Sequence, residues 1–183
     1  MTDGGRLRVR RAIFVIVLVA LVAAGAWVGL VKMKKPAGPG QVAEPKSVRT
    51  VTLYFGSTDA RSLVPEYRDI AASDNLLDNL RVLVEALISG PTENAAGLFP
   101  RTVTVRGVYI NGKTAYIDFS RELIGDFAGG SAGEYLLVAS LVQTICANFP
   151  EVASVVVLVG GEEVDTIGGH LDVSKPLFPR DWR

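Results

Sequence analysis

Two carboxylates and a hydroxyl lie close together in the segment YIDFSREL, residues 116–123. Asp118 and Glu122 are a candidate acid–base pair, because two carboxyl groups in different environments can divide the roles of proton donor and acceptor. However, Asp118 alternates with apolar neighbours, as in a strand, and an Asp-x-Ser pattern can bond backbone amides where a strand leaves a sheet. We therefore interpret Asp118 and Ser120 as structural and keep the acid–base pair as the alternative.

The single histidine, His170, lies in GGHLDVSKPL, residues 168–177. An exposed histidine titrates near neutral pH, but one histidine without an identified partner is weak evidence for catalysis. Asp172 and Ser174 repeat the Asp-x-Ser pattern, and Pro176 cannot donate a hydrogen bond in a sheet. The segment is predicted to be a chain reversal in which Asp172 and Ser174 bond backbone amides.

Other site chemistry has less support. His170, Asp172 and Asp118 could ligate a metal, but they come from separated segments without any of the usual ligand spacings. A serine triad would need Ser120 or Ser174 beside His170, and neither serine lies in a Gly-x-Ser-x-Gly turn that would expose a nucleophile.

The segment GGSAG at residues 129–133 precedes a predicted helix and has the glycines of a phosphate-binding loop, but it lacks the lysine of a P-loop. We interpret it as a flexible start of the helix. The sequence therefore predicts no catalytic, cofactor-binding or metal-binding residue, and no cofactor.

The first elements are predicted from periodicity. Between Arg49 and Phe55 apolar residues alternate with polar ones, which predicts a strand with one buried face. After a polar loop, a helix begins at a cap formed by Ser73 or Asp74 and is ended by Gly90-Pro91. The apolar stripe of this helix is Leu76, Leu80, Leu83, Val84, Leu87 and Ile88.

Residues 102–110 and 113–120 flank Asn111-Gly112, a pair suited to the positive backbone dihedrals of a two-residue hairpin turn. Straight pairing through this turn would put valines of the first strand on the wrong face of the sheet. A bulge at Arg106-Gly107 is predicted because one extra residue restores the register.

Ser131 and Glu134 have the spacing of a capping box, which predicts the start of a second helix. The apolar stripe of that helix is Val138, Leu141, Val142, Ile145 and Phe149. Residues 152–159 are a continuous apolar run typical of a central strand, and residues 163–167 are predicted to return as a short edge strand.

The predicted order of elements is β-α-β-β-α-β within residues 48–177, followed by a C-terminal tail at residues 178–183. This order predicts an α+β fold in which two helices pack on one face of a small three- or four-stranded sheet.

Residues 12–31 contain no charged side chain, and a helix of this length spans a bilayer. We expect one transmembrane anchor, preceded by a basic tail at residues 1–11 and followed by a Pro- and Gly-rich linker at residues 32–47. Because the tail is much shorter than the part that follows the anchor, the N-terminus is expected in the cytoplasm and the folded part outside it. The alternative is a signal peptide whose cleavage removes residues 1–26.

The charge of the chain is divided between its two parts. Residues 46–183 carry 12 Lys and Arg against 17 Asp and Glu, so the folded part is acidic although the whole chain is neutral. An acidic domain opposes nucleic-acid binding, which requires a positive field. The one cysteine, Cys146, is expected to be a buried thiol and cannot form a disulfide within the chain.

Several short motifs, in this order and spacing, resemble those of the GerMN domain family of bacterial sporulation and spore-germination proteins. They are Leu53-Tyr54-Phe55, Leu87-Ile88-Ser89-Gly90-Pro91, Gly97-Leu98-Phe99-Pro100, Ala115-Tyr116-Ile117-Asp118-Phe119-Ser120, Gln143-Thr144-Ile145 with Phe149-Pro150, and Gly169-His170-Leu171-Asp172. The resemblance covers about residues 48–177. The chain departs from the germination protein of spore formers by having one such domain and no lipoprotein cysteine, and Arg101 stands where a glycine is expected.

The resemblance implies an extracytoplasmic, membrane-tethered and non-enzymatic domain, with a fold similar to the ring-building motifs of sporulation secretion complexes. We expect a single-pass protein of the bacterial inner membrane that binds another envelope protein, copies of itself or peptidoglycan, with a link to sporulation or germination. The alternatives are a wall-modifying hydrolase that uses Asp118, Glu122 or His170, and a ligand-sensing domain, which would require a pocket that the sequence does not show.

Overall fold

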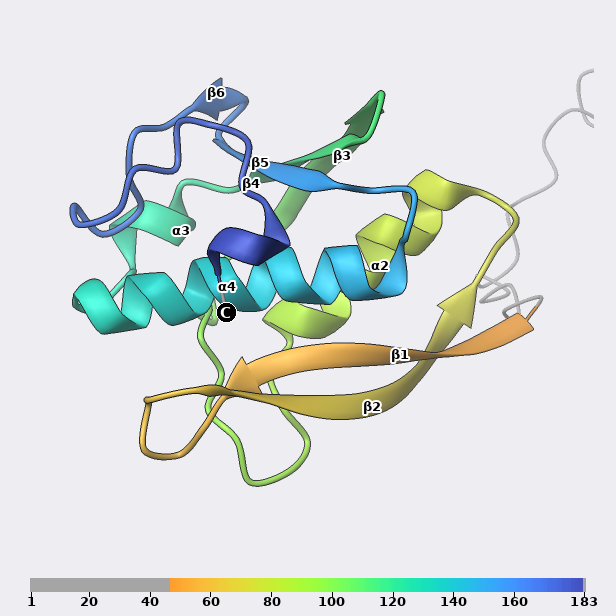
Figure 1. Ribbon diagram of the computed structural model, residues 1–183, viewed down its shortest axis with the longest axis horizontal. Helices are drawn as coiled ribbons and strands as arrows, with labels where there is room; N and C mark the ends of the chain where they lie inside the picture. The colour runs from red at the N-terminus through yellow and green to blue at the C-terminus, as the bar shows by residue number, and fades with distance from the viewer. Residues whose placement is uncertain (1–46, 183) are drawn as a thin grey trace, which may run out of the picture. The chain divides into compact units, whose positions relative to one another are not determined.

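The computed structural model describes residues 47–182, and Figure 1 shows their helices and strands. The predicted tail at residues 1–11 and anchor at residues 12–31 lie outside the described residues, as does the linker up to residue 46. Within residues 47–182, no helix is both long enough and apolar enough to cross a membrane. The described fold is therefore that of the C-terminal domain.

The first two strands form an antiparallel ribbon. β1 (Ser47–Gly56) pairs along its whole length with β2 (Leu63–Ala72). The alternation predicted for β1 is confirmed, because its three apolar residues in the alternating positions are buried. The prediction of a polar loop after β1 is wrong, since most of that segment is β2. Charged residues such as Glu66 and Arg68 interrupt the apolar alternation of β2, so periodicity does not reveal the strand.

Glu66 and Arg68 connect the ribbon to the end of the next helix. The Glu66 carboxylate forms an ion pair with Arg68 and accepts hydrogen bonds from the Thr92 amide and hydroxyl, both at 2.9 Å. Arg68 donates to the carbonyl oxygens of Ala86 at 3.0 Å and Gly90 at 2.9 Å. Burial alone would raise the pKa of Glu66, but the hydrogen bonds from Thr92 and Arg68 outweigh it and lower that pKa.

α2 (Leu76–Ile88) is the predicted first helix. Its N-cap is Asn75, just after the predicted Ser73 or Asp74, and the Asn75 side chain accepts a hydrogen bond of 2.8 Å from the Leu77 amide. Most of the predicted stripe is fully buried, namely Leu80, Leu83, Val84 and Leu87.

The predicted hairpin is confirmed as β3 (Val105–Asn111) and β4 (Thr114–Phe119). Its turn consists of Gly112 and Lys113, one residue later than predicted, and Gly112 takes the positive φ of 59°. The register shifts across Arg106, which confirms the predicted bulge.

β5 (Ser154–Val159) lies parallel to β4 and is the predicted central strand, and β6 (Glu162–Glu163) pairs antiparallel with β5. The four-stranded sheet has the order β3-β4-β5-β6. The edge strand predicted at residues 163–167 is wrong in extent, because only its first residue belongs to β6.

A short helix, α3 (Glu122–Gly125), follows β4, and the long helix α4 (Ser131–Asn148) begins at the predicted residue. The predicted capping box is wrong, because Gly130 occupies the N-cap position and no side chain caps the helix. Through its middle, α4 is buried on nearly every side, which is typical of a helix enclosed by other elements.

Figure 1 shows α4 between the β1–β2 ribbon on one side and the four-stranded sheet on the other. The α+β class is confirmed, but the predicted β-α-β-β-α-β order with one sheet is corrected. The structure has two sheets, and β1 belongs to the separate ribbon.

Polar side chains of α4 bond the free edge of β1 and explain why β1 does not join the larger sheet. Ser140 donates to the Tyr54 carbonyl at 2.6 Å, and Thr144 accepts from the Tyr54 amide at 3.0 Å. The Asn148 amide group donates to the Thr52 carbonyl at 2.7 Å and accepts from the Thr52 amide at 3.0 Å. The three side chains are spaced by four residues, so they share one helix face.

The C-terminal residues 178–182 pack against α4 and are part of the domain, although the sequence predicts a tail at residues 178–183. A 3₁₀ helix spans Pro179–Asp181. The Gln143 side chain donates to the carbonyl oxygens of Pro179 at 3.0 Å and Trp182 at 2.7 Å, and Trp182 is 9% exposed.

Candidate functional site

Asp118 lies at the end of β4 and is buried. It bonds a backbone amide, as predicted, but the amide is that of Gly161, at 2.8 Å. The Arg106 guanidinium lies 3.4 Å from its other oxygen. Asp118 therefore fixes the turn between β5 and β6 to the bulge of β3.

Glu122 begins α3 and is exposed. A hydrogen bond from the Ser120 hydroxyl lowers the pKa of Glu122, and that hydroxyl also accepts a bond of 3.0 Å from the Thr104 amide. In residues 47–182, no hydrogen bond or ion pair joins Asp118, Glu122 and His170 to one another. The structure thus does not assemble the acid–base pair considered from the sequence.

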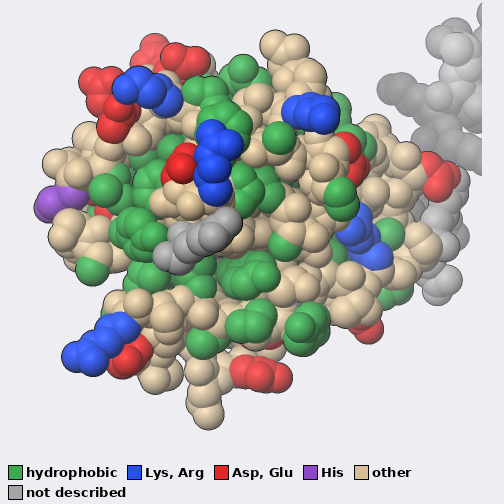
Figure 2. All heavy atoms as spheres, viewed as in Figure 1, with side chains coloured by type: hydrophobic (Ala, Val, Ile, Leu, Met, Phe, Trp, Pro, Cys, Tyr) green, Lys and Arg blue, Asp and Glu red, His purple; other side chains and the backbone are tan. Residues whose placement is uncertain are grey.

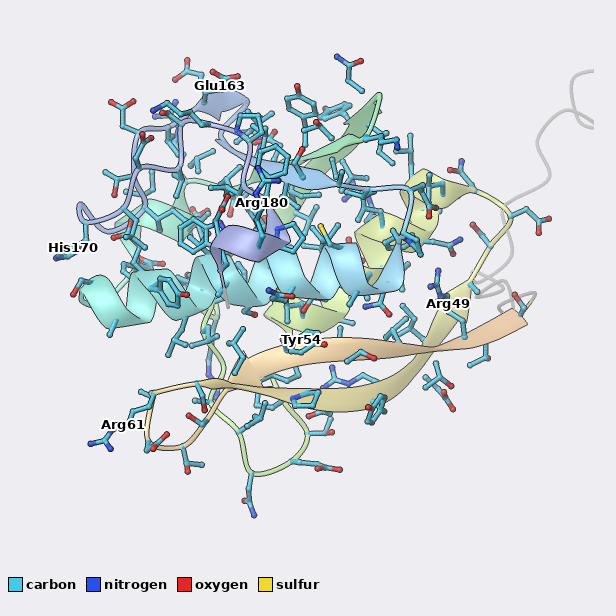
Figure 3. All side chains as sticks on the ribbon, in the orientation of Figure 1. Arg49, Tyr54, Arg61, Glu163, His170 and Arg180 are labelled. Atoms are coloured by element: carbon cyan, nitrogen blue, oxygen red, sulfur yellow. The ribbon has the colours of Figure 1, made fainter. Side chains whose placement is uncertain are left out.

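His170 instead contacts Glu134, the residue assigned to the capping box. Its Nδ1 atom lies 3.2 Å from Oε2 of Glu134. The Glu134 side chain is fully buried, whereas the His170 side chain is 44% exposed. Figure 3 shows His170 on an outer loop beside the start of α4.

Glu134 and residues 166–170 form a cluster that we call the Glu134 cradle. Oε1 accepts hydrogen bonds from the Thr166 hydroxyl at 2.7 Å, the Ile167 amide at 2.9 Å and the Gly168 amide at 2.8 Å. Oε2 accepts from the His170 amide at 2.9 Å. Burial alone would raise the pKa of Glu134, but these hydrogen bonds outweigh it and lower that pKa.

The two glycines before His170 have different roles. A Cβ atom at Gly168 would lie 2.5 Å from the Phe127 ring and 3.1 Å from the Glu134 carboxylate, so only glycine allows this close approach. Gly169 has a φ of 87°, a conformation that glycine adopts without strain. Both glycines therefore serve the shape of the Glu134 cradle.

The rest of the GGHLDVSKPL segment confirms the predicted chain reversal. Asp172 accepts a bond of 3.0 Å from the Ser174 amide. The Ser174 hydroxyl and Lys175, both bonded to Asp172, lower the pKa of Asp172 to about 2. The chain then returns to the sheet, where Leu177 exchanges two backbone hydrogen bonds with Val155.

The remaining candidates have ordinary surroundings. Among residues 47–182, no group of three or more His, Cys, Asp or Glu side chains is placed to hold a metal ion. The glycines of residues 129–133 lead into α4, where the Gly130 carbonyl accepts a hydrogen bond from the Glu134 amide. Burial raises the pKa of the half-buried Cys146 thiol to about 11, so it is a poor nucleophile at neutral pH.

A pocket of about 310 Å³ lies between α4, the loop of the β1–β2 ribbon and the C-terminal segment. We call it the aromatic pocket, and its lining includes Tyr54, Arg61, Ser62, Tyr135, Gln143 and Trp182. The sequence does not reveal this pocket, because its residues come from four separate segments. On the face seen in Figure 2, hydrophobic side chains gather over α4 and beside the C-terminal segment.

The sequence profile of the Germane family, described as sporulation and spore germination, matches residues 52–165. The chain belongs to the Germane family. A search of curated proteins finds no match.

Solved structures share the Germane fold. The chain is 26% identical to a candidate lipoprotein of Clostridium perfringens, with a TM-score of 0.55, over 74% of this chain and 90% of that one. It is 21% identical to the first GerMN domain of the Bacillus subtilis sporulation protein GerM, with a TM-score of 0.60, over 73% of this chain and 99% of that one. With the tandem GerMN domains of GerM, the identity is 22% and the TM-score 0.57, over 74% of this chain and 48% of that one.

The Germane motifs quoted from the sequence have structural roles in this fold. Leu53-Tyr54-Phe55 belongs to β1. The segment Leu87–Pro91 contains the end of α2 and the Gly90 carbonyl that accepts a hydrogen bond from Arg68. The Germane match ends at residue 165, so His170 and Trp182 belong to the segment beyond it. The Glu134 cradle and the aromatic pocket thus each combine residues inside the profile match with residues after it.

Proposed function

We propose that this Germane protein is a membrane-anchored, extracytoplasmic and non-enzymatic interaction module of the bacterial cell envelope, linked to sporulation or germination. The proposal rests on the structural role of the carboxylates. Glu134, Asp118 and Asp172 all accept hydrogen bonds from backbone amides, and they hold the C-terminal segment and the turns in place. Side chains in this role stabilise a binding scaffold and are not free to exchange protons with a substrate.

Two further facts support the location in the envelope. The apolar, uncharged residues 12–31 have the length of a membrane-spanning helix. The related Clostridium perfringens protein is described as a candidate lipoprotein, and lipoproteins are held at a membrane. The anchor would place the domain outside the inner membrane, within reach of another envelope protein, a second copy or peptidoglycan.

The location is tested by adding protease to intact protoplasts that produce the chain. Digestion of the domain from outside is expected, and protection until the membrane is lysed would overturn the proposed location. Crosslinking in intact cells followed by mass spectrometry then identifies the captured partners. The control is the anchor expressed without the domain. If the full chain crosslinks to envelope components no more than this control does, the proposed interaction role is overturned.

The hydrolase alternative is tested on purified cell wall. The chain is expected to release no soluble sugar or peptide. Release that falls in Glu122→Gln and His170→Ala variants would overturn the non-enzymatic proposal. These two side chains are exposed enough to be changed without disturbing the core.

A further inference from the structure

Three aromatic side chains line the aromatic pocket, together with aliphatic and polar ones. Tyr54 comes from β1, Tyr135 from α4 and Trp182 from the C-terminal segment. The rings of Tyr135 and Trp182 have centroids 5.4 Å apart and planes inclined by 43°, so they form an angled wall. In Figure 3, Tyr54 lies toward the C-terminal end of β1, and Arg61 extends outward from the loop at the end of the ribbon.

The size of the pocket limits the ligand. A volume of about 310 Å³ is at the small end of the range for small-molecule sites. The pocket therefore accommodates a unit of about one ring. Aromatic walls favour a ligand that presents a flat apolar face, such as the C–H face of a pyranose.

The wall of the pocket does not suit an extended peptide. A peptide that adds to a strand needs free amides and carbonyls along its edge. On β1 these groups are already bonded at Tyr54, by Ser140 and Thr144 of α4. A peptide therefore cannot add to β1 as a further strand at this point.

The charge of the lining selects among such ligands. Residues 46–183 have an excess of acidic side chains, yet the pocket lining contains Arg61 and no Asp or Glu. In residues 47–182 the Arg61 guanidinium has no ion-pair partner, and its exposed side chain can turn toward a bound anion. The Arg61 guanidinium favours a ligand that carries a carboxylate, because the two can form a charge-assisted pair.

We infer that the aromatic pocket binds a single sugar ring bearing a carboxylate, the chemistry of the lactyl-substituted amino sugar of bacterial wall glycan. The inference rests on the proposed function and names its ligand. The ring stacks against Tyr54 and the wall of Tyr135 and Trp182, while Arg61 pairs with the carboxylate.

The test uses the full chain with Trp27→Phe, so that Trp182 is its only tryptophan. The protein is kept in a detergent without a sugar headgroup, and Trp182 fluorescence is followed while N-acetylmuramic acid or N-acetylglucosamine is added. The two sugars differ in the lactyl carboxylate. Saturable binding of both is expected, with N-acetylmuramic acid bound about tenfold more tightly because a charge-assisted pair is added.

Three variants in this background locate the site. Tyr54→Ala is expected to weaken the binding of both sugars by about tenfold, because a stacking face is lost. Arg61→Glu is expected to remove the preference for the carboxylate and leave N-acetylglucosamine binding unchanged. Arg180→Ala removes an exposed arginine outside the lining and is expected to change neither affinity.

Two results would overturn the inference. One is the absence of saturation up to about 10 mM of either sugar, a concentration that fills a site of 1 mM affinity. The other is an unchanged sugar preference in Arg61→Glu, a substitution at an exposed position that leaves the core intact. If either occurs while crosslinking in cells still captures envelope partners, the ligand assignment fails and the proposed function stands.

Discussion

The Glu134 cradle gives the sharpest test of the structure, through the substitution Glu134→Gln. Glutamine has nearly the same shape, so the Oε1 position keeps its three donors from Thr166, Ile167 and Gly168. The NH₂ group then replaces Oε2 and faces the His170 amide, which is also a donor. That amide loses its acceptor, and the three remaining hydrogen bonds change from a charged acceptor to a neutral one.

The size of the effect follows from these contacts. A hydrogen bond to a charged group contributes about 1.5–3 kcal/mol, against about 0.5–1.5 kcal/mol for a neutral bond, and an unsatisfied buried donor costs about 1–3 kcal/mol. Part of this loss is offset, because burying a neutral amide costs less than burying a carboxylate. We expect Glu134→Gln to lower the free energy of unfolding by about 2–4 kcal/mol at neutral pH.

The pH dependence has a definite sign. The pKa of Glu134 is lower in the folded protein than its ordinary value of about 4.3. Its contribution to stability is therefore fully present above the ordinary pKa and is lost as the pH falls through the lowered folded value. The difference in stability between the wild type and Glu134→Gln should shrink over that window.

The assay is equilibrium unfolding in urea followed by far-ultraviolet circular dichroism, at neutral pH and at stepwise lower pH. Glu163→Gln is the matched control, because Glu163 is exposed and forms no side-chain hydrogen bond or ion pair among residues 47–182. It should change the free energy of unfolding by less than about 0.5 kcal/mol. The role of Glu134 would be refuted if both variants lost the same free energy of unfolding. It would also be refuted if the stability difference between the wild type and Glu134→Gln did not shrink at acidic pH.

Three further predictions use the same structure. Gly168→Ala should lower the melting temperature, since its Cβ would lie 2.5 Å from the Phe127 ring, while Gly125→Ala, with open space around it, should not. Asn148→Ala should lower the free energy of unfolding in urea by about 1–3 kcal/mol, because the β1 edge loses two hydrogen bonds. An unchanged midpoint of unfolding would contradict the role of that edge. Cys146 should react with iodoacetamide at neutral pH much more slowly in the folded chain than in urea, as measured by mass spectrometry, because burial raises its pKa to about 11; equal rates would contradict this.

Much of the fold could be predicted because its signals are local. The alternation in β1, the stripe of α2 and the hairpin with its bulge each depend on residues within one segment. β2 could not be found in this way, since Glu66 and Arg68 face partners from α2 and the loop after it. The placement of β1 outside the main sheet also depended on a distant element, the polar face of α4.

The candidate site was predicted less well, for the same reason. Asp172 and Ser174 form the expected turn because their partners are two residues apart. Asp118 keeps the expected kind of bond, but its partner lies 43 residues away. The aromatic pocket has no signal in the sequence, because a ring from β1 meets rings from α4 and the C-terminal segment only in the folded chain.

The sequence by itself determined the α+β class and the positions of most helices and strands, since these depend on periodicity and turn chemistry over a few residues. The order and spacing of its short motifs also indicated the family. Only the tertiary structure decided what His170 and Glu134 do. The capping box between Ser131 and Glu134 was a local alternative, but the donors of the Glu134 cradle come from 32 to 36 residues further along the chain. A buried carboxylate is stable only where enough donors converge on it, and that convergence is a property of the fold.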